Sequence, residues 1–312
     1  NDRAIGRETM SSLAKRYGAK AAVNSGYFVT TGPYSGASAG AYLWNGEVVS
    51  NGRNRTVLLL CAEQNGVEKI DTDIVNFEGK ITTSKGLSHA VTGVNRPRGA
   101  NDLIVYRPML GPTTLTDRDG VEAIVDARGR VVKVEDGAGN TEIPRDGYVI
   151  SASGAAADWL RSKVSQGSAI QLDLQLKPSR PDTCKATDIV GGGPLLVRNG
   201  KAMPSQENLA HEAKRHPRTA AGYTRRGTIL FVTVDGRQSS SAGMRIDELA
   251  QELVSLGAVE AVNLDGGGST TMLVNGRIRN SPSDGVERPV SDGLLVLTGG
   301  EHRRGFSQSS KH

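Results

Sequence analysis

The spacing of apolar residues along the chain predicts which segments are helices and which are strands. Segments 7–19, 155–164 and 245–257 carry apolar residues at helical spacing, and the first and last of them close at a glycine, a common helix stop. Between residues 40 and 180 the pattern is mostly that of strands. Segment 169–177 alternates strictly between apolar and polar residues, which predicts a strand with one buried face.

Two pairs of short strands are predicted to form hairpins. Segment 121–136 has two apolar runs separated by a turn that contains Gly129. Segment 191–201 has the same form, and its turn is Asn199 and Gly200, a pair that favours a tight hairpin connection.

The last third of the chain predicts a strand, a helix and a second strand in that order. Segment 228–236 is nearly continuous in apolar residues, the helix over 245–257 follows, and 259–266 forms the next strand. This order suggests a parallel pair joined by a crossover, with the two strands adjacent or nearly so. Asp235 and Asp265 would then lie at the carboxyl ends of these strands, the edge at which ligand sites collect in such sheets.

The residues that follow the two aspartates suggest a ligand site. Asp265 is followed by Gly-Gly-Gly-Ser and Asp235 by Gly-Arg. A glycine run costs backbone entropy, but it lets a substrate approach the chain closely and leaves amide N–H groups for an anionic oxygen. The alternative is a tight turn in which Asp265 caps its own backbone. Because both strands end in an aspartate followed by glycine, we favour the ligand site.

The composition describes a turn-rich globular protein. The 312 residues are 37% hydrophobic, with 39 glycines and 12 prolines dispersed among them, which suits one large domain. The net charge is +5, but the basic residues are scattered without interleaved aromatic residues, so we expect no nucleic-acid partner. No apolar run is long enough to span a membrane. Because the chain does not begin with Met, we expect a processed protein that is secreted or associated with the cell envelope.

The cysteines and histidines do not form a metal motif. Cys61 and Cys184 belong to no CxxC pair, and the five histidines lack metal-ligand spacing, so we expect no cofactor and find no indication of a divalent cation. The cysteines can form one disulfide in an exported protein or remain two buried thiols, and both alternatives stay open. We interpret His211 and His216 as structural or solvated. No Walker loop, GxSxG elbow, HExxH motif or dinucleotide fingerprint occurs.

Six motifs, taken in order, resemble those of the phosphodiester glycosidase family from about residue 5 to residue 297. They are VNSGYF, GGGPLLV, HPRTAAG, VDGRQSSSAGM, NLDGGGSTTM and the closing segment 280–296. The ordered set is more specific than any one motif. The resemblance implies an α+β fold in which mixed curved β-sheets pack around a few helices. We expect a single catalytic domain over 1–298 and a disordered tail over 299–312.

The resemblance also implies which residues form the site. Asp265 is expected to be the primary catalytic carboxylate and Asp235 the second. One of them would activate water or attack the anomeric carbon while the other orients or stabilises. Arg218, Arg237 and Arg288 are expected to hold the phosphate through bidentate contacts. The other residues expected to bind substrate are Asn24, Gly26, Phe28, Thr219, Gly266, Gly267, Gly268 and Ser269.

The expected reaction is hydrolysis of the glycosidic C–O bond of a sugar-1-phosphodiester, which releases a free sugar and a phosphomonoester. A phosphate leaving group is already stable as an anion, so it needs little general-acid help and more positive charge around it. The expected partner is a carbohydrate or glycan phosphate of the cell envelope, and the oligomeric state stays open. Two alternatives remain: hydrolysis of ordinary glycosidic bonds in envelope polysaccharide, and a non-catalytic polysaccharide-binding or assembly module.

Overall fold

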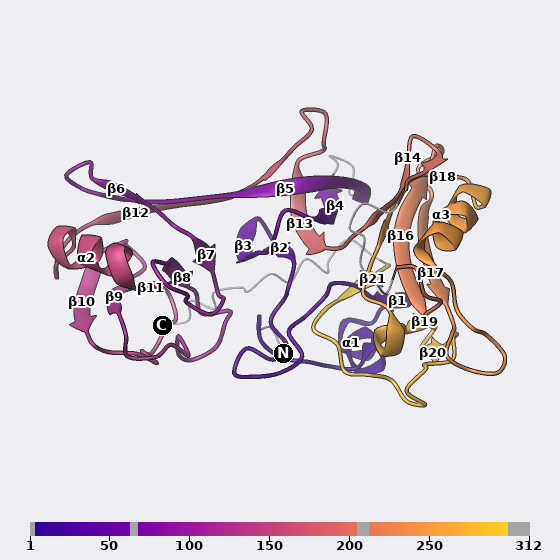
Figure 1. Cartoon of the computed structure of the whole chain (residues 1–312), viewed down its shortest axis with the longest axis horizontal. Coiled ribbons are helices and arrows are strands. Elements are labelled where there is room, and N and C mark those ends of the chain that lie inside the picture. The colour runs from indigo at the N-terminus through magenta and orange to yellow at the C-terminus, as the bar shows by residue number, and fades with distance from the viewer. Residues whose placement is uncertain (1–3, 63–67, 205–211, 299–312) are drawn as a thin grey trace.

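The computed structural model describes residues 4–62, 68–204 and 212–298. Strands predominate in these residues; they form four sheets, against which three α-helices pack. In the view of Figure 1 one sheet lies at the left, one in the middle and two together at the right, and the long strand β5 runs across the middle. The expected mixture of sheets and a few helices is confirmed. The tail expected over 299–312 lies outside the described residues, as does His211.

The central sheet is built on the pairing of its two longest strands. Its order is β12-β5-β4-β13-β2-β3, and β6 also pairs with β5. The strand predicted over 169–177 is confirmed as β12, which pairs with β5 from Ile170 opposite Thr83 to Pro178 opposite Val75. The members of this sheet are β2 (Ala41–Trp44), β3 (Glu47–Asn51), β4 (Thr56–Ala62), β5 (Glu68–Thr83), β6 (Ser88–Ala90), β12 (Ile170–Pro178) and β13 (Ala186–Gly191).

A disulfide joins β4 to the segment that precedes β13. Cys61 is buried in β4 and is bonded to Cys184, with the two Cα atoms 6.1 Å apart. The bond links positions separated by 123 residues in the sequence. The sequence left a disulfide and two free thiols as alternatives, and the structure selects the disulfide.

A second sheet, of order β10-β9-β11-β8-β7, packs against helix α2 at the left of Figure 1. The hairpin predicted over 121–136 is confirmed as β9 and β10, and the helix predicted over 155–164 is confirmed as α2. Leu160 of α2 is fully buried against the sheet. The elements are β7 (Gly93–Val94), β8 (Leu103–Tyr106), β9 (Val121–Val125), β10 (Val131–Asp136), β11 (Tyr148–Ala152) and α2 (Gly154–Lys163).

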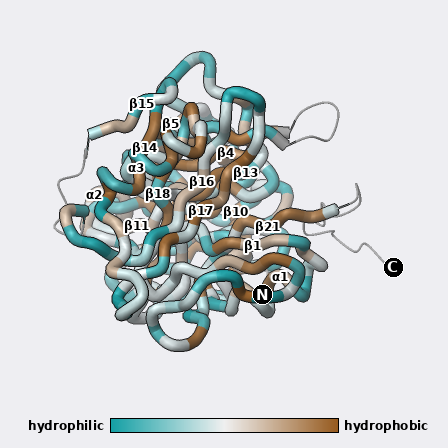
Figure 2. Tube along the Cα trace, turned by 90° about the vertical axis from the view of Figure 1, so that its right-hand side faces the viewer, coloured by the Kyte–Doolittle hydropathy of each residue, from teal (hydrophilic) through white to brown (hydrophobic). Residues whose placement is uncertain are grey.

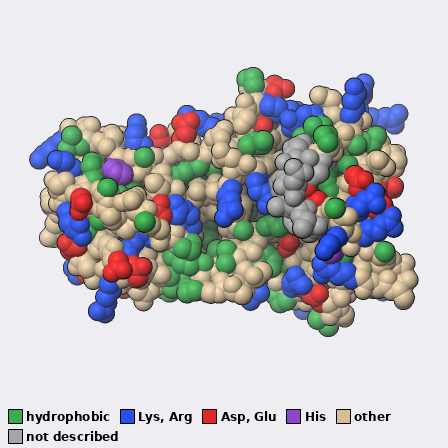
Figure 3. Space-filling model, viewed as in Figure 1, with side chains coloured by type: hydrophobic (Ala, Val, Ile, Leu, Met, Phe, Trp, Pro, Cys, Tyr) green, Lys and Arg blue, Asp and Glu red, His purple; other side chains and the backbone are tan. Residues whose placement is uncertain are grey.

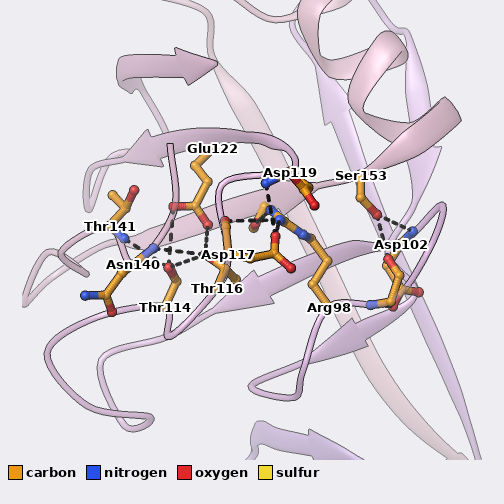
Figure 4. Close-up of polar contacts among 12 residues, drawn as sticks. Arg98, Asp102, Thr114, Thr116, Asp117, Asp119, Glu122, Asn140, Thr141 and Ser153 are labelled. Carbon is orange, nitrogen blue, oxygen red and sulfur yellow. Dashed lines mark hydrogen bonds and ion pairs between the residues drawn. The ribbon is translucent and has the colours of Figure 1, made fainter. Parts of the chain in front are cut away.

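A polar network inside this second sheet holds the loop that precedes β9 (Figure 4). The buried carboxylate of Glu122 accepts a hydrogen bond from the Thr116 hydroxyl at 2.8 Å. Arg98 donates to the Ser151 hydroxyl at 2.7 Å and forms an ion pair with Asp117. Because the buried side chains of Glu122 and Arg98 both find partners, the network satisfies their polar atoms and has a structural role.

The third sheet has the order β15-β14-β18-β16-β17. Strands β17 and β18 are both antiparallel to β16, which lies between them, so they run parallel to each other. The parallel direction predicted from the strand-helix-strand order is therefore confirmed, with one strand inserted between the pair. The elements are β14 (Leu195–Arg198), β15 (Lys201–Ala202), β16 (Arg218–Thr224), β17 (Ile229–Val234), α3 (Ile246–Ser255) and β18 (Ala258–Asn263).

The position of β17 at the edge of this sheet explains a difference from the sequence pattern. Its apolar run suggested a buried strand, but Ile229 is exposed and the remaining residues are only partly buried. Helix α3 covers β14 and β18 instead, and its residues Leu249 and Leu253 are fully buried there. The hairpin predicted over 191–201 is confirmed as β14 and β15.

The fourth sheet, of order β20-β19-β1-β21, carries helix α1. The helix is capped by the Thr9 side chain, and it ends at Gly18, whose φ of +66° suits glycine. Figure 2 shows apolar stretches along β1 and β21 and along the strands of the third sheet. The elements are α1 (Met10–Tyr17), β1 (Ala21–Asn24), β19 (Met272–Val274), β20 (Arg277–Ile278) and β21 (Gly293–Val296).

Candidate active site

One edge of the third sheet gathers the polar residues that the sequence singled out. Strand β17 ends just before Asp235, and β18 ends just before the turn that contains Asp265. Strand β16 runs in the opposite direction, so its first residue, Arg218, lies at the same edge. The strand order thus brings together side chains from three separate sequence motifs.

The loop that begins at Asp265 is fixed by neighbouring segments. The Asp265 amide donates to the carbonyl of Ser25 at 2.8 Å, and the Asp265 carbonyl accepts from the Asn24 side-chain amide at 2.6 Å. The Gly267 amide donates to the Pro217 carbonyl at 2.9 Å. A Cβ at Gly266 would lie 2.7 Å from that same carbonyl oxygen, so this position requires glycine.

Two guanidinium groups lie against the glycines of this loop. A Cβ at Gly267 would lie 3.2 Å from Nη2 of Arg237, and a Cβ at Gly268 would collide with the guanidinium of Arg288. The glycine run therefore leaves space for two cations beside Asp265. The structure brings Arg237, Arg288 and the residues from Gly266 to Ser269 together, as the sequence predicted.

Each of these arginines has a partner that orients it. Arg288 forms an ion pair with Asp284 at 2.7 Å. Arg237 adopts a left-handed backbone conformation with φ of +60° and donates from Nε to Nδ1 of His216 at 3.4 Å. His216 was interpreted as structural or solvated, and this contact gives it a role in holding Arg237.

Arg218 differs from the other two arginines because its side chain is buried. Only 4% of Arg218 is exposed, and its guanidinium donates to the carbonyls of Met244 and Lys214, both at 2.9 Å. Burial lowers the pKa of Arg218. These contacts show Arg218 holding two backbone segments behind the glycine loop, and its expected contact with phosphate stays a prediction.

Asp292, which the sequence analysis did not single out, is part of the same site. Its Oδ1 accepts hydrogen bonds from the Ser25 hydroxyl and the Gly26 amide, both at 2.5 Å, and its Oδ2 accepts from Ser291 at 3.0 Å. A Cβ at Gly26 would lie 2.9 Å from Oδ2 of Asp292, which explains the glycine there. An Asp-Gly pair beside a strand does not single out Asp292, because similar pairs adjoin other strands, and only the tertiary contacts identify it.

The electrostatics of the site centre on Asp265. Although part of its surface is exposed, its carboxyl group is surrounded by protein, and this burial raises its pKa to about 6. The negative charge of Asp292 raises the pKa further, whereas Ser269 and Arg288 oppose the shift. Burial also raises the pKa of Asp292. Such a carboxyl group, shifted toward neutral pH and beside cations, is typical of a functional site.

Asp235 lies at the expected edge of the sheet, and its side chain binds the segment after β20. Its Oδ1 accepts from the Asn280 side-chain amide at 3.2 Å and from the Ser281 amide at 2.9 Å. Its backbone carbonyl accepts from the Ser241 hydroxyl at 2.6 Å. These contacts favour a positioning role for Asp235, and the catalytic role expected from the sequence stays a prediction.

The remaining expected residues divide between the site and the core. Thr219 is buried, and its hydroxyl donates to Oδ1 of Asn24 at 3.0 Å, so both support the loop from behind. Phe28 packs instead with a hydrophobic cluster that includes Met10 and Val290. The structure therefore gives Phe28 a packing contact, and its expected substrate contact stays a prediction.

Among the residues that the structure describes, no group of three or more His, Cys, Asp or Glu side chains is arranged to hold a metal ion. Within the same residues, no helix is long and apolar enough to cross a membrane.

Comparisons with known proteins were made with the whole chain. A family model described as phosphodiester glycosidase matches residues 119–297. N-acetylglucosamine-1-phosphodiester alpha-N-acetylglucosaminidase of Bos taurus is 43% identical over 109 residues, which cover 31% of this chain and 20% of the bovine protein. An uncharacterized SPbeta prophage-derived protein of Bacillus subtilis is 37% identical over 105 residues, which cover 33% of this chain and 16% of that protein. The matches thus span a fifth or less of the length of these two relatives.

A solved structure matches almost the whole chain. It is that of a Burkholderia pseudomallei protein provisionally named as exported, with a TM-score of 0.81 and 30% identity. The match covers 96% of this chain and 69% of that protein.

Proposed function

Because the chain belongs to the phosphodiester glycosidase family, we propose that it hydrolyses the glycosidic C–O bond of a sugar-1-phosphodiester. The products are a free sugar and a phosphomonoester. One observation carries the proposal: a carboxyl group with a raised pKa, Asp265, stands beside a glycine loop against which the guanidinium groups of Arg237 and Arg288 lie.

The leaving group explains why cations stand beside the carboxylate. When the bond from the anomeric carbon to the phosphate oxygen breaks, the oxygen keeps the electron pair and becomes part of a phosphomonoester. Arg237 and Arg288 would stabilise the negative charge that grows on this group. The amides of the glycine loop would add further donors, since such loops bind anionic oxygens.

Asp265 would act on the other side of the anomeric carbon. Ionised at neutral pH, a carboxylate whose pKa is about 6 is a stronger base than an ordinary aspartate. It can attack the anomeric carbon or take a proton from the water that does so. The atoms balance: water supplies the new hydroxyl of the sugar, and its other proton is released.

Asp292 and Asp235 would position the segments around Asp265. Asp292 holds Ser25 and Gly26, and Ser25 in turn accepts the hydrogen bond of the Asp265 amide. Asp235 holds the segment at Ser281 beside the same edge.

We place the substrate on a cell-envelope or extracellular glycan and assign the activity to a single domain over 1–298. The disulfide between Cys61 and Cys184 supports a secreted or envelope location, because disulfides persist mainly in oxidising compartments. The provisional name of the Burkholderia relative supports the same location.

Hydrolysis in oxygen-18 water tests the proposed bond cleavage. We expect the label on the anomeric carbon of the released sugar, read before exchange, and an unlabelled phosphomonoester. Label in the phosphate would show that water attacks phosphorus, and it would overturn the proposed cleavage of the glycosidic C–O bond. Matched glycosides of the same sugar without phosphate form the control. Equal turnover of these glycosides would identify an ordinary glycosidase.

A further inference from the structure

A second basic region adjoins the site through Tyr27. It consists of Arg53 and Arg55, which lie between β3 and β4. The guanidinium carbon of Arg55 lies 5.2 Å from the centre of the Tyr27 ring, a distance at which a cation and an aromatic ring attract each other. Arg53 is exposed and forms no ion pair with any described residue.

The Tyr27 ring is held by two hydrogen bonds and lies next in sequence to a residue that binds Asp292. Its hydroxyl donates to the Gly193 carbonyl at 2.8 Å and accepts from the Asn263 side-chain amide at 2.7 Å. Tyr27 directly follows Gly26, whose amide binds Asp292. The ring therefore connects the second basic region to the site without a flexible element.

Two closely packed glycines form part of the wall of a small cavity in this region. Arg53, Arg55 and Tyr27 line a small cavity of about 30 Å³ together with Gly40 and Gly191. A Cβ at Gly40 would lie 2.6 Å from the Cα of Gly191, so the two chain segments touch here and neither position has room for a side chain. The cavity is too small for a phosphate group, so a charged group of a larger ligand would bind outside it, beside the arginines that line it.

The two basic regions lie in different parts of the molecule. Arg237 and Arg288 belong to the segments that follow β17 and β20, at the right of Figure 1, whereas β3 and β4 stand in its middle. Figure 3 shows basic side chains both near the middle of this face and over its right-hand half. When one phosphate is bound at the glycine loop, the second basic region is available to bind another negatively charged group.

We propose that Arg53 and Arg55 form a second anion subsite that binds a further phosphodiester of the same substrate. This inference rests on the proposed function and narrows its substrate class to glycans with repeated sugar-phosphate units. Guanidinium groups suit this ligand because each offers several N–H donors to phosphate oxygens. The subsite would hold the glycan while its neighbouring sugar-phosphate unit is hydrolysed at Asp265.

Binding to the Asp265→Asn variant tests the subsite separately from catalysis. The probes are the methyl phosphodiester of N-acetylglucosamine 1-phosphate and a tetramer of N-acetylglucosamine units joined by 1-phosphodiesters. Arg53→Gln with Arg55→Gln should weaken binding of the tetramer by about tenfold or more, the loss that follows from about 1.4 kcal/mol of charged contacts. The same change should leave binding of the methyl diester within about twofold.

The matched control is Arg128→Gln, since Arg128 is an exposed arginine of the β9–β10 turn in another sheet. It should alter neither affinity. If the double variant fails to fold, Arg53→Gln alone serves, because Arg53 is exposed. An unchanged tetramer affinity, or an equal loss for both probes, would overturn the subsite.

A third probe distinguishes phosphate from carboxylate. It is the tetramer in which uronic acid groups replace all phosphates except the one at the reactive unit. Weaker binding of this probe supports the proposal, and binding tighter than that of the phosphate tetramer overturns it. If wild-type protein hydrolyses none of the phosphodiesters, the proposed function fails, while the affinities measured with Asp265→Asn still decide on the subsite.

Discussion

The side-chain amide of Asn24 donates a 2.6 Å hydrogen bond to the backbone carbonyl of Asp265, although 241 positions separate the two residues in the sequence. The other atom of that amide, Oδ1, accepts from the Thr271 amide and the Thr219 hydroxyl, both at 3.0 Å. A single buried side chain thus joins β1 to both ends of the glycine loop and to β16. The position of Asp265 depends on Asn24, and the substrate contact expected of Asn24 stays a prediction.

Asn24→Ala should therefore loosen the loop and destabilise the protein. It leaves the Asp265 carbonyl and the Thr271 amide without this hydrogen-bond partner at a site with no solvent exposure, whereas the Thr219 hydroxyl keeps a bond to Thr270. We expect a loss of about 3 kcal/mol in the free energy of unfolding. Turnover should fall at temperatures where the variant is still folded. Urea unfolding and initial rates measure the two effects. A variant of wild-type stability and activity would show that the loop is held by other contacts.

Asp265→Asn should abolish most of the turnover, by about 100-fold to 10,000-fold, because a positioned acid–base group typically contributes that much. It should also stabilise the folded protein above pH 7. The folded pKa is raised to about 6 from 3.8, so wild-type protein loses stability as the pH rises through this window and the buried group ionises. Thermal unfolding at pH 4 and pH 8 should show a gain for the variant only at pH 8.

The rate of the wild-type enzyme should rise with pH as Asp265 ionises. If the carboxylate acts as nucleophile or base, kcat/KM should increase about tenfold per pH unit below its pKa of about 6 and level off above it. A rate that instead falls above pH 6 would show Asp265 acting as a general acid. Arg288→Gln should move the midpoint upward, because the Arg288 charge lowers the pKa of Asp265.

Substitution of Asp235 by Asn should reduce turnover much less than the same substitution of Asp265. Asp235→Asn keeps an oxygen that can accept from the Ser281 amide, so we expect turnover within about tenfold of wild type. Asp235→Ala removes that acceptor and should reduce turnover more. A loss for Asp235→Asn as large as that for Asp265→Asn would restore the second catalytic carboxylate that the sequence suggested.

Replacement of Cys184 by Ser should lower stability without changing the site. The disulfide constrains 123 positions of the unfolded chain, and removing such a bond typically costs about 2 to 5 kcal/mol. The kinetic constants of the folded variant should match wild type. Alkylation of the native, unreduced protein, read by mass spectrometry, should modify neither cysteine, and modification of both would contradict the bond.

The sequence by itself determined the local elements and the chemistry available to them. Apolar spacing identified the three helices and the β9–β10 and β14–β15 hairpins, because burial of one face imposes a period that can be read directly. The run after Asp265 identified the loop as a candidate site, since three glycines cost backbone entropy and leave the chain open to close approach. The ordered motifs identified the family that the comparison with residues 119–297 then showed.

The tertiary structure alone decided which of these residues meet. Insertion of β16 between β17 and β18 brought Arg218 to the edge, and pairing of β1 with β21 brought Asp292 to Gly26. Neither follows from local spacing, because strand order is set by contacts between segments far apart in the chain. The same contacts buried Arg218 and raised the pKa of Asp265, since both depend on the protein atoms that surround a side chain and not on its neighbours in sequence.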